Sequence, residues 1–351
     1  MTAGRQRIGT SATPIVECLT GGRIFLVNAP RLRYATFALG GVKKGDRMIR
    51  VLGFIALGLS VFATQSIAEG RTQIGYGRLI QNDFIGDGQD RWRTGSVASS
   101  RVWGPEGQVG LPQTFGELLE FRINAEIIAP DNLVTPAAGD RPYAGSLSFG
   151  LHTHYERSNI EYAVGLDMVL TGEMTLLGDF QGALHDLLGV DKASDSTLAS
   201  QIDNAVHPTA VIEVGRTFSI GEQVEMRPFV EARAGVETML RAGADISFGR
   251  VGSDELQVRD PVSGQRYRVI QNPEEGFSFV VGGDIAKVRD SAYLPEAGGY
   301  TVTDTRSRLR AGVHWQGEIT NIFYGVTWLG EEFEGQDEGQ VVGSLRLNLN
   351  F

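Results

Sequence analysis

Apolar and polar side chains alternate along one segment after another of this chain, from residue 72 to its carboxyl end. The last segment is the clearest, because single polar residues separate Leu345, Leu347, Leu349 and the terminal Phe351. Side chains of a β-strand point alternately to the two faces of a sheet, so a period of two predicts strands with one apolar and one polar face. The chain is therefore predicted to be all-β.

Twelve segments carry this pattern, which is an even number. Lengths near ten residues suit strands that cross a bilayer at a tilt. The predicted strands are residues 72–82, 92–103, 117–128, 142–155, 159–171, 209–219, 222–235, 238–249, 276–288, 300–316, 319–329 and 340–351.

The polar face of these strands favours a membrane barrel over a soluble sandwich. It carries Arg, Glu, Asp, Asn and His together with many of the 46 glycines, which suits a polar lumen. In the alternative, a soluble β-sandwich, the apolar face would form the core instead. The predicted fold is a 12-stranded antiparallel transmembrane β-barrel of the outer-membrane type.

Composition excludes two other classes of protein. The formal net charge of -10 provides no basic surface for nucleic acid, and the single cysteine, Cys18, cannot build a disulfide framework or a thiolate metal site.

Residues 48–68 have the order of a secretory signal peptide. Arg50 precedes an apolar run over residues 51–63, and Ser66-Ile67-Ala68 comes directly before Glu69. The run is too short to span a bilayer. The alternative is a buried helix of a longer folded chain.

From this segment we expect translation to start at Met48, so that residues 1–47 are an upstream extension. The mature protein would then be residues 69–351, a single outer-membrane barrel that lacks cysteine. Its expected location is the bacterial outer membrane.

In a barrel with an even number of strands and both chain ends in the periplasm, the loops lie alternately outside the cell and in the periplasm. One inner connection, residues 250–275, is predicted to be an unusually long periplasmic loop. The longest outer loop contains Phe180, Leu184 and Leu188 at helical spacing. A short helix is therefore predicted there, ending at Gly189. The predicted outer loops are residues 83–91, 129–141, 172–208, 236–237, 289–299 and 330–339.

Polar groups gather in the loops that parity places at the outer end of the barrel. Gln181 and His185 are four residues apart, and so lie on one face of the predicted helix. A carboxylate and an amide oxygen are ligands that calcium takes, and a neutral imidazole suits proton abstraction from water. The groups are Asn82-Asp83, Asp90-Arg91 with Thr94, Asp140-Arg141-Pro142-Tyr143, Gln181 with His185, and Asp191.

Each group also has a simpler interpretation. His185 would be a surface histidine, Asn82-Asp83 a turn before a strand, and Arg141 a salt-bridge partner of Asp140. Their predicted convergence on one rim favours a functional site.

Four motifs resemble those of the outer-membrane lipid A deacylases of the LpxR family, over roughly residues 74–351. QNDFIGDGQDRWRTG resembles the family's Asn-Asp followed by an Asp-Arg-x-x-Thr turn, and GDRPYAG resembles the opening of its fourth strand. QGALHDLLGVD resembles its Gln-x-x-x-His helix with a following acidic position, and the terminal strand ends in Phe351. The sequence departs from the family at Arg93, Gly95 and Asp191.

The resemblance implies an esterase that removes the 3'-linked acyloxyacyl chain of lipid A, from lipopolysaccharide in the outer leaflet, with calcium. It implies His185 as the base that activates water. Asp83 and Asn82 would hold the ion or the oxyanion, and Asp191 would be a further ion ligand. The other implied roles are a supporting ligand at Thr94, an orienting cation at Arg141, and substrate contacts at Gln181 and Asp140.

Two other functions remain open from the residues alone. Gly-rich, charged inward positions suit a passive channel. An esterase of the same architecture acting on phospholipid is the other alternative.

Overall fold

The computed structural model describes residues 71–108 and 110–349. The predicted upstream extension, residues 1–47, and the predicted signal peptide, residues 48–68, lie outside the described residues. Phe351 lies outside them as well.

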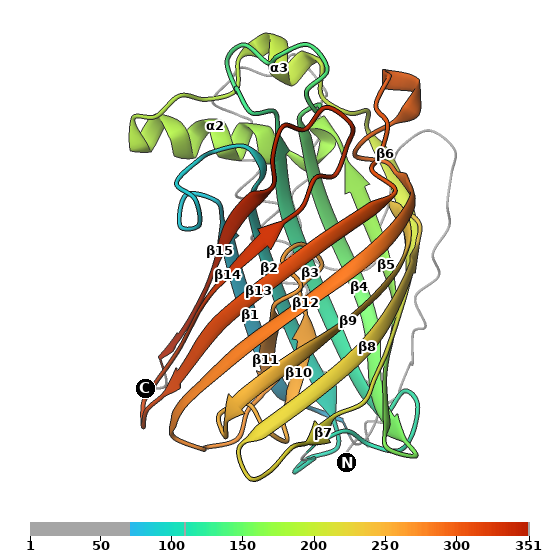
Figure 1. The fold of residues 1–351 in the computed structure, drawn as a ribbon, viewed down its shortest axis with the longest axis vertical. Coiled ribbons are helices and arrows are strands. Elements are labelled where there is room, and N and C mark those ends of the chain that lie inside the picture. Colours follow the sequence, from blue (N-terminus) through green and yellow to red (C-terminus); the bar gives the residue numbers. More distant parts are fainter. Residues whose placement is uncertain (1–70, 109, 350–351) are drawn as a thin grey trace, which may run out of the picture. The chain divides into compact units, whose positions relative to one another are not determined.

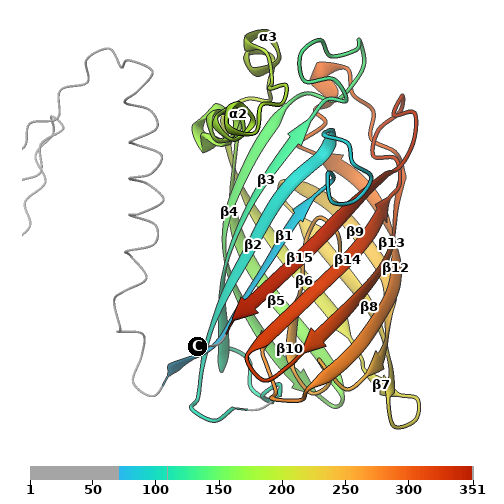
Figure 2. The same cartoon turned by 90° about the vertical axis from the view of Figure 1, so that its left-hand side faces the viewer.

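Twelve long antiparallel strands form one closed sheet (Figures 1 and 2). The ring closes between the first and last strands, where Ile80 pairs with Leu345. The predicted all-β barrel is therefore confirmed. The strands are β1 (Thr72–Asn82), β2 (Trp92–Gly104), β3 (Leu118–Ala129), β4 (Ala144–Arg157), β5 (Ile160–Thr171), β6 (Ala205–Gly215), β8 (Val224–Ala234), β9 (Glu237–Gly249), β12 (Gly276–Ser291), β13 (Thr305–Gln316), β14 (Thr320–Leu329) and β15 (Gln340–Leu349).

The sixth strand differs from its predicted range, residues 209–219. It begins at Ala205, is interrupted after Gly215, and resumes as β7 (Phe218–Ser219), with both pieces paired to β8. Pro228 of β8 lies opposite the interruption and has no backbone N–H to donate to the ladder.

Apolar side chains face outward and polar ones inward, as the period predicts. On β13, Leu309 is 61% exposed, whereas its neighbours Arg308 and Arg310 are each 4% exposed. Leu166 on β5 and Leu347 on β15 also face outward and are exposed. This arrangement suits an outer wall in contact with lipid and a polar lumen.

Residues 250–275 do not form the long periplasmic loop that was predicted. They form a hairpin, β10 (Leu256–Arg259) and β11 (Arg266–Ile270), that lies inside the barrel (Figure 1). Tyr267 at 0% and Val258 at 2% exposure pack against apolar side chains that point inward from the wall. Gln265 donates to the Thr327 hydroxyl of β14 at 3.3 Å. This hairpin is called the plug below.

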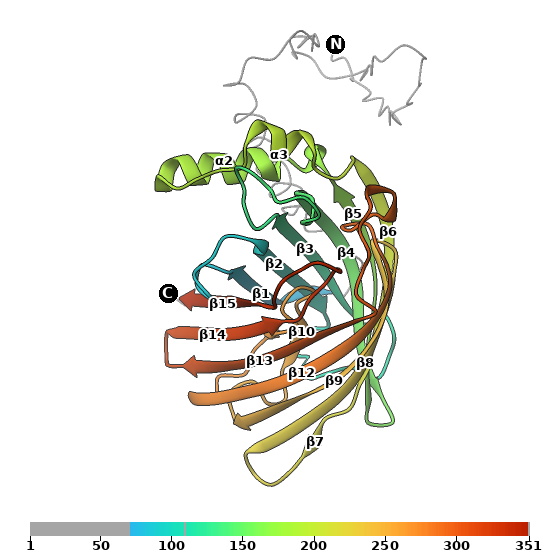
Figure 3. The same ribbon diagram turned by 45° about the horizontal axis from the view of Figure 1, so that its top comes forward.

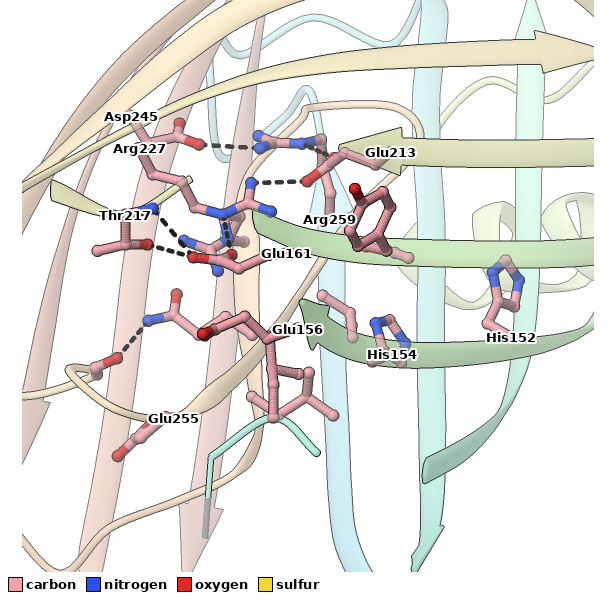
Figure 4. Close-up of a pocket in the computed structure, with 18 of the residues that line it drawn as sticks. His152, His154, Glu156, Glu161, Glu213, Thr217, Arg227, Asp245, Glu255 and Arg259 are labelled. Carbon is pink, nitrogen blue, oxygen red and sulfur yellow. Dashed lines mark hydrogen bonds and ion pairs between the residues drawn. The ribbon is translucent and has the colours of Figure 1, made fainter. Parts of the chain in front are cut away.

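Ion pairs fill much of the lumen around the plug. Arg259 of the plug donates to Glu213 of β6 at 2.6 Å and to Asp245 of β9 at 3.0 Å. A cavity of about 220 Å³ remains beside them, lined by charged side chains (Figure 4). The plug and these buried pairs disfavour the passive channel.

The helices lie at the rim where β1 ends and β15 begins (Figures 1 and 3). Between β5 and β6 lie η2 (Glu173–Thr175), α2 (Leu177–Leu188) and α3 (Asp195–Ala199), and η3 (Glu296–Gly298) follows β12. The predicted helix ending at Gly189 is therefore confirmed. We call this end of the barrel the helix-bearing rim. Within residues 71–108 and 110–349, no helix has the length and apolar character needed to span a membrane.

Candidate active site

Four residues, from three of the polar groups singled out in the sequence, meet at the helix-bearing rim. Asp83 follows β1, Asp90 precedes β2, Thr94 lies near the start of β2, and His185 is on α2. Thr94 contacts both carboxylates, and Asp90 contacts His185. These four residues are called the rim cluster.

Asn82 holds the turn that leads into the rim cluster. Its side-chain oxygen accepts the backbone N–H of Phe84 at 2.9 Å, and its side-chain nitrogen donates to the Thr94 carbonyl at 2.8 Å. An asparagine side chain that bonds the backbone two residues ahead stabilises such a turn. Asn82 thus fixes the end of β1 against the start of β2, and its oxygen keeps one lone pair.

Asp83 is a buried carboxylate, 0% exposed. It accepts the backbone N–H of Arg91 at 2.7 Å and the Thr94 hydroxyl at 3.3 Å. Burial raises the pKa of Asp83 to about 8, and the charges of Asp90 and Asp87 add to the effect of burial. A cation placed here would stabilise the ionised form.

Thr94 lies between the two carboxylates of the rim cluster. Its hydroxyl contacts Asp90 in a short hydrogen bond and Asp83 at 3.3 Å. One hydroxyl has one proton and cannot donate to both carboxylates at once. The second contact therefore needs either the proton that the raised pKa leaves on Asp83 or a hard cation between the oxygens.

His185 has its two ring nitrogens in different environments. Nδ1 lies 2.6 Å from the backbone carbonyl oxygen of Asp191, and Nε2 lies 3.4 Å from the Asp90 carboxylate. A carbonyl oxygen only accepts, so Nδ1 carries a proton and Nε2 is the basic nitrogen of the neutral ring. Nε2 therefore faces the carboxylate of Asp90.

The end of α2 explains how Asp191 reaches His185. Gly189 has φ of 70°, in the left-handed region that glycine adopts most easily, and it reverses the chain after the helix. The Val190 N–H then bonds the His185 carbonyl at 3.1 Å. The Asp191 carbonyl is carried back to the ring, whereas the Asp191 side chain is exposed.

Gln181 lies one turn before His185 on the same buried face of α2. Its side-chain oxygen accepts the Tyr143 hydroxyl at 2.9 Å. This bond links α2 to the segment that enters β4. Gly145 of β4 lets η2 pack closely against this segment, since a Cβ placed at Gly145 would lie 2.3 Å from the Thr175 hydroxyl oxygen.

Arg141 does not contact the rim cluster. It is 1% exposed, and its guanidinium donates to Glu332 in the β14–β15 loop at 2.5 Å. Burial lowers the pKa of Arg141. Asp140, instead of pairing with the Arg141 guanidinium, accepts backbone N–H groups of Asp131 and Arg141 at 2.6 and 2.7 Å.

Two residues at this rim were missed by sequence reasoning. Glu332 is surrounded by guanidiniums; burial raises the pKa of its carboxyl, but Arg93, Arg141 and Arg306 outweigh burial and hold the pKa well below its usual range. Gln340, at the start of β15, donates to the Arg91 carbonyl at 2.6 Å and closes the barrel beside Asp83. Parity places both residues at the correct rim, but their partners come from distant strands.

The oxygen-rich donor set suits a hard cation. Asp83, Asp90 and Thr94 offer two carboxylates and a hydroxyl, and calcium takes oxygen ligands of these kinds. Within the described ranges, no group of three or more His, Cys, Asp or Glu side chains is arranged to hold a metal ion. Any cation here would therefore complete its shell with other oxygens.

Comparisons with known proteins agree with the fold. The family model described as outer membrane protein LpxR matches residues 51–351. The structure is similar to LpxR from Salmonella typhimurium, with a TM-score of 0.65 and 19% identity over 79% of this chain and 100% of that one. A NanC porin matches with a TM-score of 0.35 and 4% identity, over 79% of this chain and 100% of that one. The β domain of the Bordetella autotransporter BrkA matches at 0.36 and 11%, over 79% and 98%. No curated protein matches in sequence.

The closed barrel with an apolar outer wall defines an outer-membrane protein. Since the family model matches well over half of its length, the chain belongs to the LpxR family of outer-membrane proteins.

Proposed function

We propose that this barrel is an esterase that hydrolyses a 3'-linked acyl ester of lipid A, with His185 as the base. The observation that carries the proposal is the orientation of the imidazole. Its Nδ1 donates to the Asp191 carbonyl, so Nε2 can accept a proton, and Nε2 faces Asp90. Membership of the LpxR family supports the substrate class. The helix-bearing rim would face the cell exterior, where lipopolysaccharide lies.

In the proposed reaction His185 Nε2 takes a proton from water. The water oxygen bonds to the ester carbonyl carbon, the carbon–oxygen bond to the sugar breaks, and the proton passes to the sugar oxygen. The products are a fatty acid and a sugar hydroxyl. The Asp90 carboxylate, 3.4 Å from Nε2, would stabilise the imidazolium that forms.

Calcium is the cofactor that we propose for the rim cluster, held by Asp83 and Asp90 with Thr94 and the Asn82 oxygen nearby. When bound it would polarise the ester carbonyl. The residues themselves keep these oxygen ligands fixed, because Asp83 is held by the Arg91 N–H and Asn82 by the turn at Phe84. The exposed Asp191 side chain would reach such an ion only after rearrangement.

Mass spectra of lipid A test the proposal. Cells that produce the protein should contain lipid A lacking one acyloxyacyl chain, and cells that produce His185→Ala should not. His207→Ala is a matched control, because the imidazole of that histidine on β6 bonds Thr171 of the wall at 3.3 Å and is not part of the rim cluster. An unchanged acylation pattern, with fatty acid released from phospholipid vesicles instead, would favour the phospholipase alternative.

A further inference from the structure

One side of α2 exposes large apolar side chains. Phe180 is 49%, Leu184 41%, Leu187 82% and Leu188 64% exposed. Side chains of this kind are normally buried in a soluble environment, and a contiguous exposed set indicates a binding surface. These four residues are called the α2 patch.

The α2 patch occupies a definite side of the helix. At about 100° per residue, Leu184 and Leu187 lie to one side of His185, and the exposed acidic residues Asp179 and Asp186 lie to the other. His185 and Gln181 occupy the buried face between these two sides. The helix thus has a site face, an apolar side and an acidic side. Its apolar side of Phe and Leu is the feature that it shares with helices that lie in a membrane interface.

A second apolar pair flanks the rim cluster from the β1–β2 loop. Phe84, directly after Asp83, is 73% exposed, and Ile85 is 36% exposed. Ile85 lies against the outer wall, because its carbonyl accepts the hydroxyl of Tyr324 at 2.9 Å and Tyr324 faces outward on β14. Phe84 and Ile85 are therefore continuous with the surface that contacts lipid.

The position of α2 also indicates that lipid covers the α2 patch. The helix contacts β3 and β4, and Figures 2 and 3 show it beside the outer ends of these strands, outside the ring of the barrel. The walls below it expose Phe149 and Leu151 on β4 to lipid. A lipid surface that covers the wall would reach the α2 patch without a break.

We propose that the α2 patch and the Phe84–Ile85 pair lie in the acyl region of the surrounding lipid leaflet. They would anchor the rim cluster at the membrane boundary from two sides. An interfacial helix buries its apolar side by about 5–10 Å. This anchoring is independent of the proposed esterase activity.

Site-directed fluorescence tests the proposal without any measurement of activity. Single cysteines are introduced into the full chain with Cys18→Ser, labelled with bimane, and reconstituted in phosphatidylcholine vesicles that carry bromine on the upper acyl carbons. Leu187→Cys and Phe84→Cys should lose as much fluorescence as Leu309→Cys on the outer wall. Asp186→Cys, one residue from Leu187 on the acidic side, should lose little.

Two results would overturn the proposal. One is equal, weak quenching at positions 187 and 186 while position 309 is strongly quenched. The other is cross-linking of Leu187→Cys between two copies of the chain, which would assign the α2 patch to a dimer contact. Heat-modifiable gel mobility of each variant shows that the barrel has formed.

Discussion

At the scale of single residues, the rim cluster depends on backbone atoms that a residue pattern does not reveal. The sequence indicates an acidic position at Asp191, yet the atom that contacts His185 is the Asp191 carbonyl oxygen. Asp83, Thr94 and His185 were predictable because motif matches and strand parity place them at one rim. The ion pair of Arg141 with Glu332 was not, since the two residues are 191 positions apart.

Replacing His185 by Ala should lower esterase turnover by at least about 100-fold, the lower range for general-base catalysis. Turnover is measured as acyl chain released from purified lipid A. Added calcium should not restore it, because proton transfer is what is missing. Asp83→Asn keeps an oxygen ligand and should be partly rescued by calcium. Full activity in His185→Ala would show that another group takes the proton.

Glu332→Gln should weaken the barrel at its helix-bearing rim. It would leave Arg93, Arg141 and Arg306 without the buried carboxylate that they surround, and breaking such a buried pair costs about 3–5 kcal/mol. The temperature at which gel mobility shifts to the unfolded form should fall. Glu334→Gln, an exposed neighbour, should leave that temperature unchanged.

The same pair gives a pH dependence with a definite sign. The folded-state pKa of Glu332 lies well below the ordinary value of 4.5. Its stabilisation is therefore complete above pH 4.5 and is lost as pH falls below that value toward the folded-state pKa. The difference in unfolding temperature between the parent and Glu332→Gln should shrink in acid. A difference that grows in acid would contradict this assignment.

At the scale of elements, the strands were predictable because apolar and polar residues alternate within each of them, and this pattern does not depend on distant segments. Ten ranges agree with the structure to within three residues, the range 300–316 begins five residues too early, and the sixth is broken opposite Pro228. The placement of α2 against β4 depends instead on close contacts between distant segments. Gly145 is the point of closest approach.

Gly145→Val should therefore reduce activity and leave the barrel intact. Its side chain would collide with Thr175, displace η2 and α2, and move His185 from Asp90. Gly182→Ala is the control within α2, where the nearest atom to an added Cβ is 3.9 Å away. That change should keep activity and favour the helix by up to about 1 kcal/mol. Normal turnover in Gly145→Val would show that the approach of η2 to β4 does not position His185.

At the scale of the whole molecule, the plug was hidden because its strands are short and their side chains pack against several separate strands of the wall. One signal was present in the sequence. Leu79, Ala98 and Val102 are apolar at positions where strands of a polar lumen carry polar residues, and the plug covers them. Their apolar character indicates a packed interior rather than an open pore.

Replacing residues 254–272 by a short Gly-Ser turn should open the lumen. The parent should show no stable single-channel steps in planar bilayers, because the plug and ion pairs such as Arg259 with Glu213 occupy the interior. The shortened barrel should conduct, and it should unfold at a lower temperature, because apolar wall residues that packed against Tyr267 would face water. Among the described residues, no hydrogen bond or ion pair joins the rim cluster to the plug, so lipid A cleavage should persist wherever the shortened barrel folds. Stable steps of the same size in both proteins would mean that ions pass outside the plug and would revive the channel.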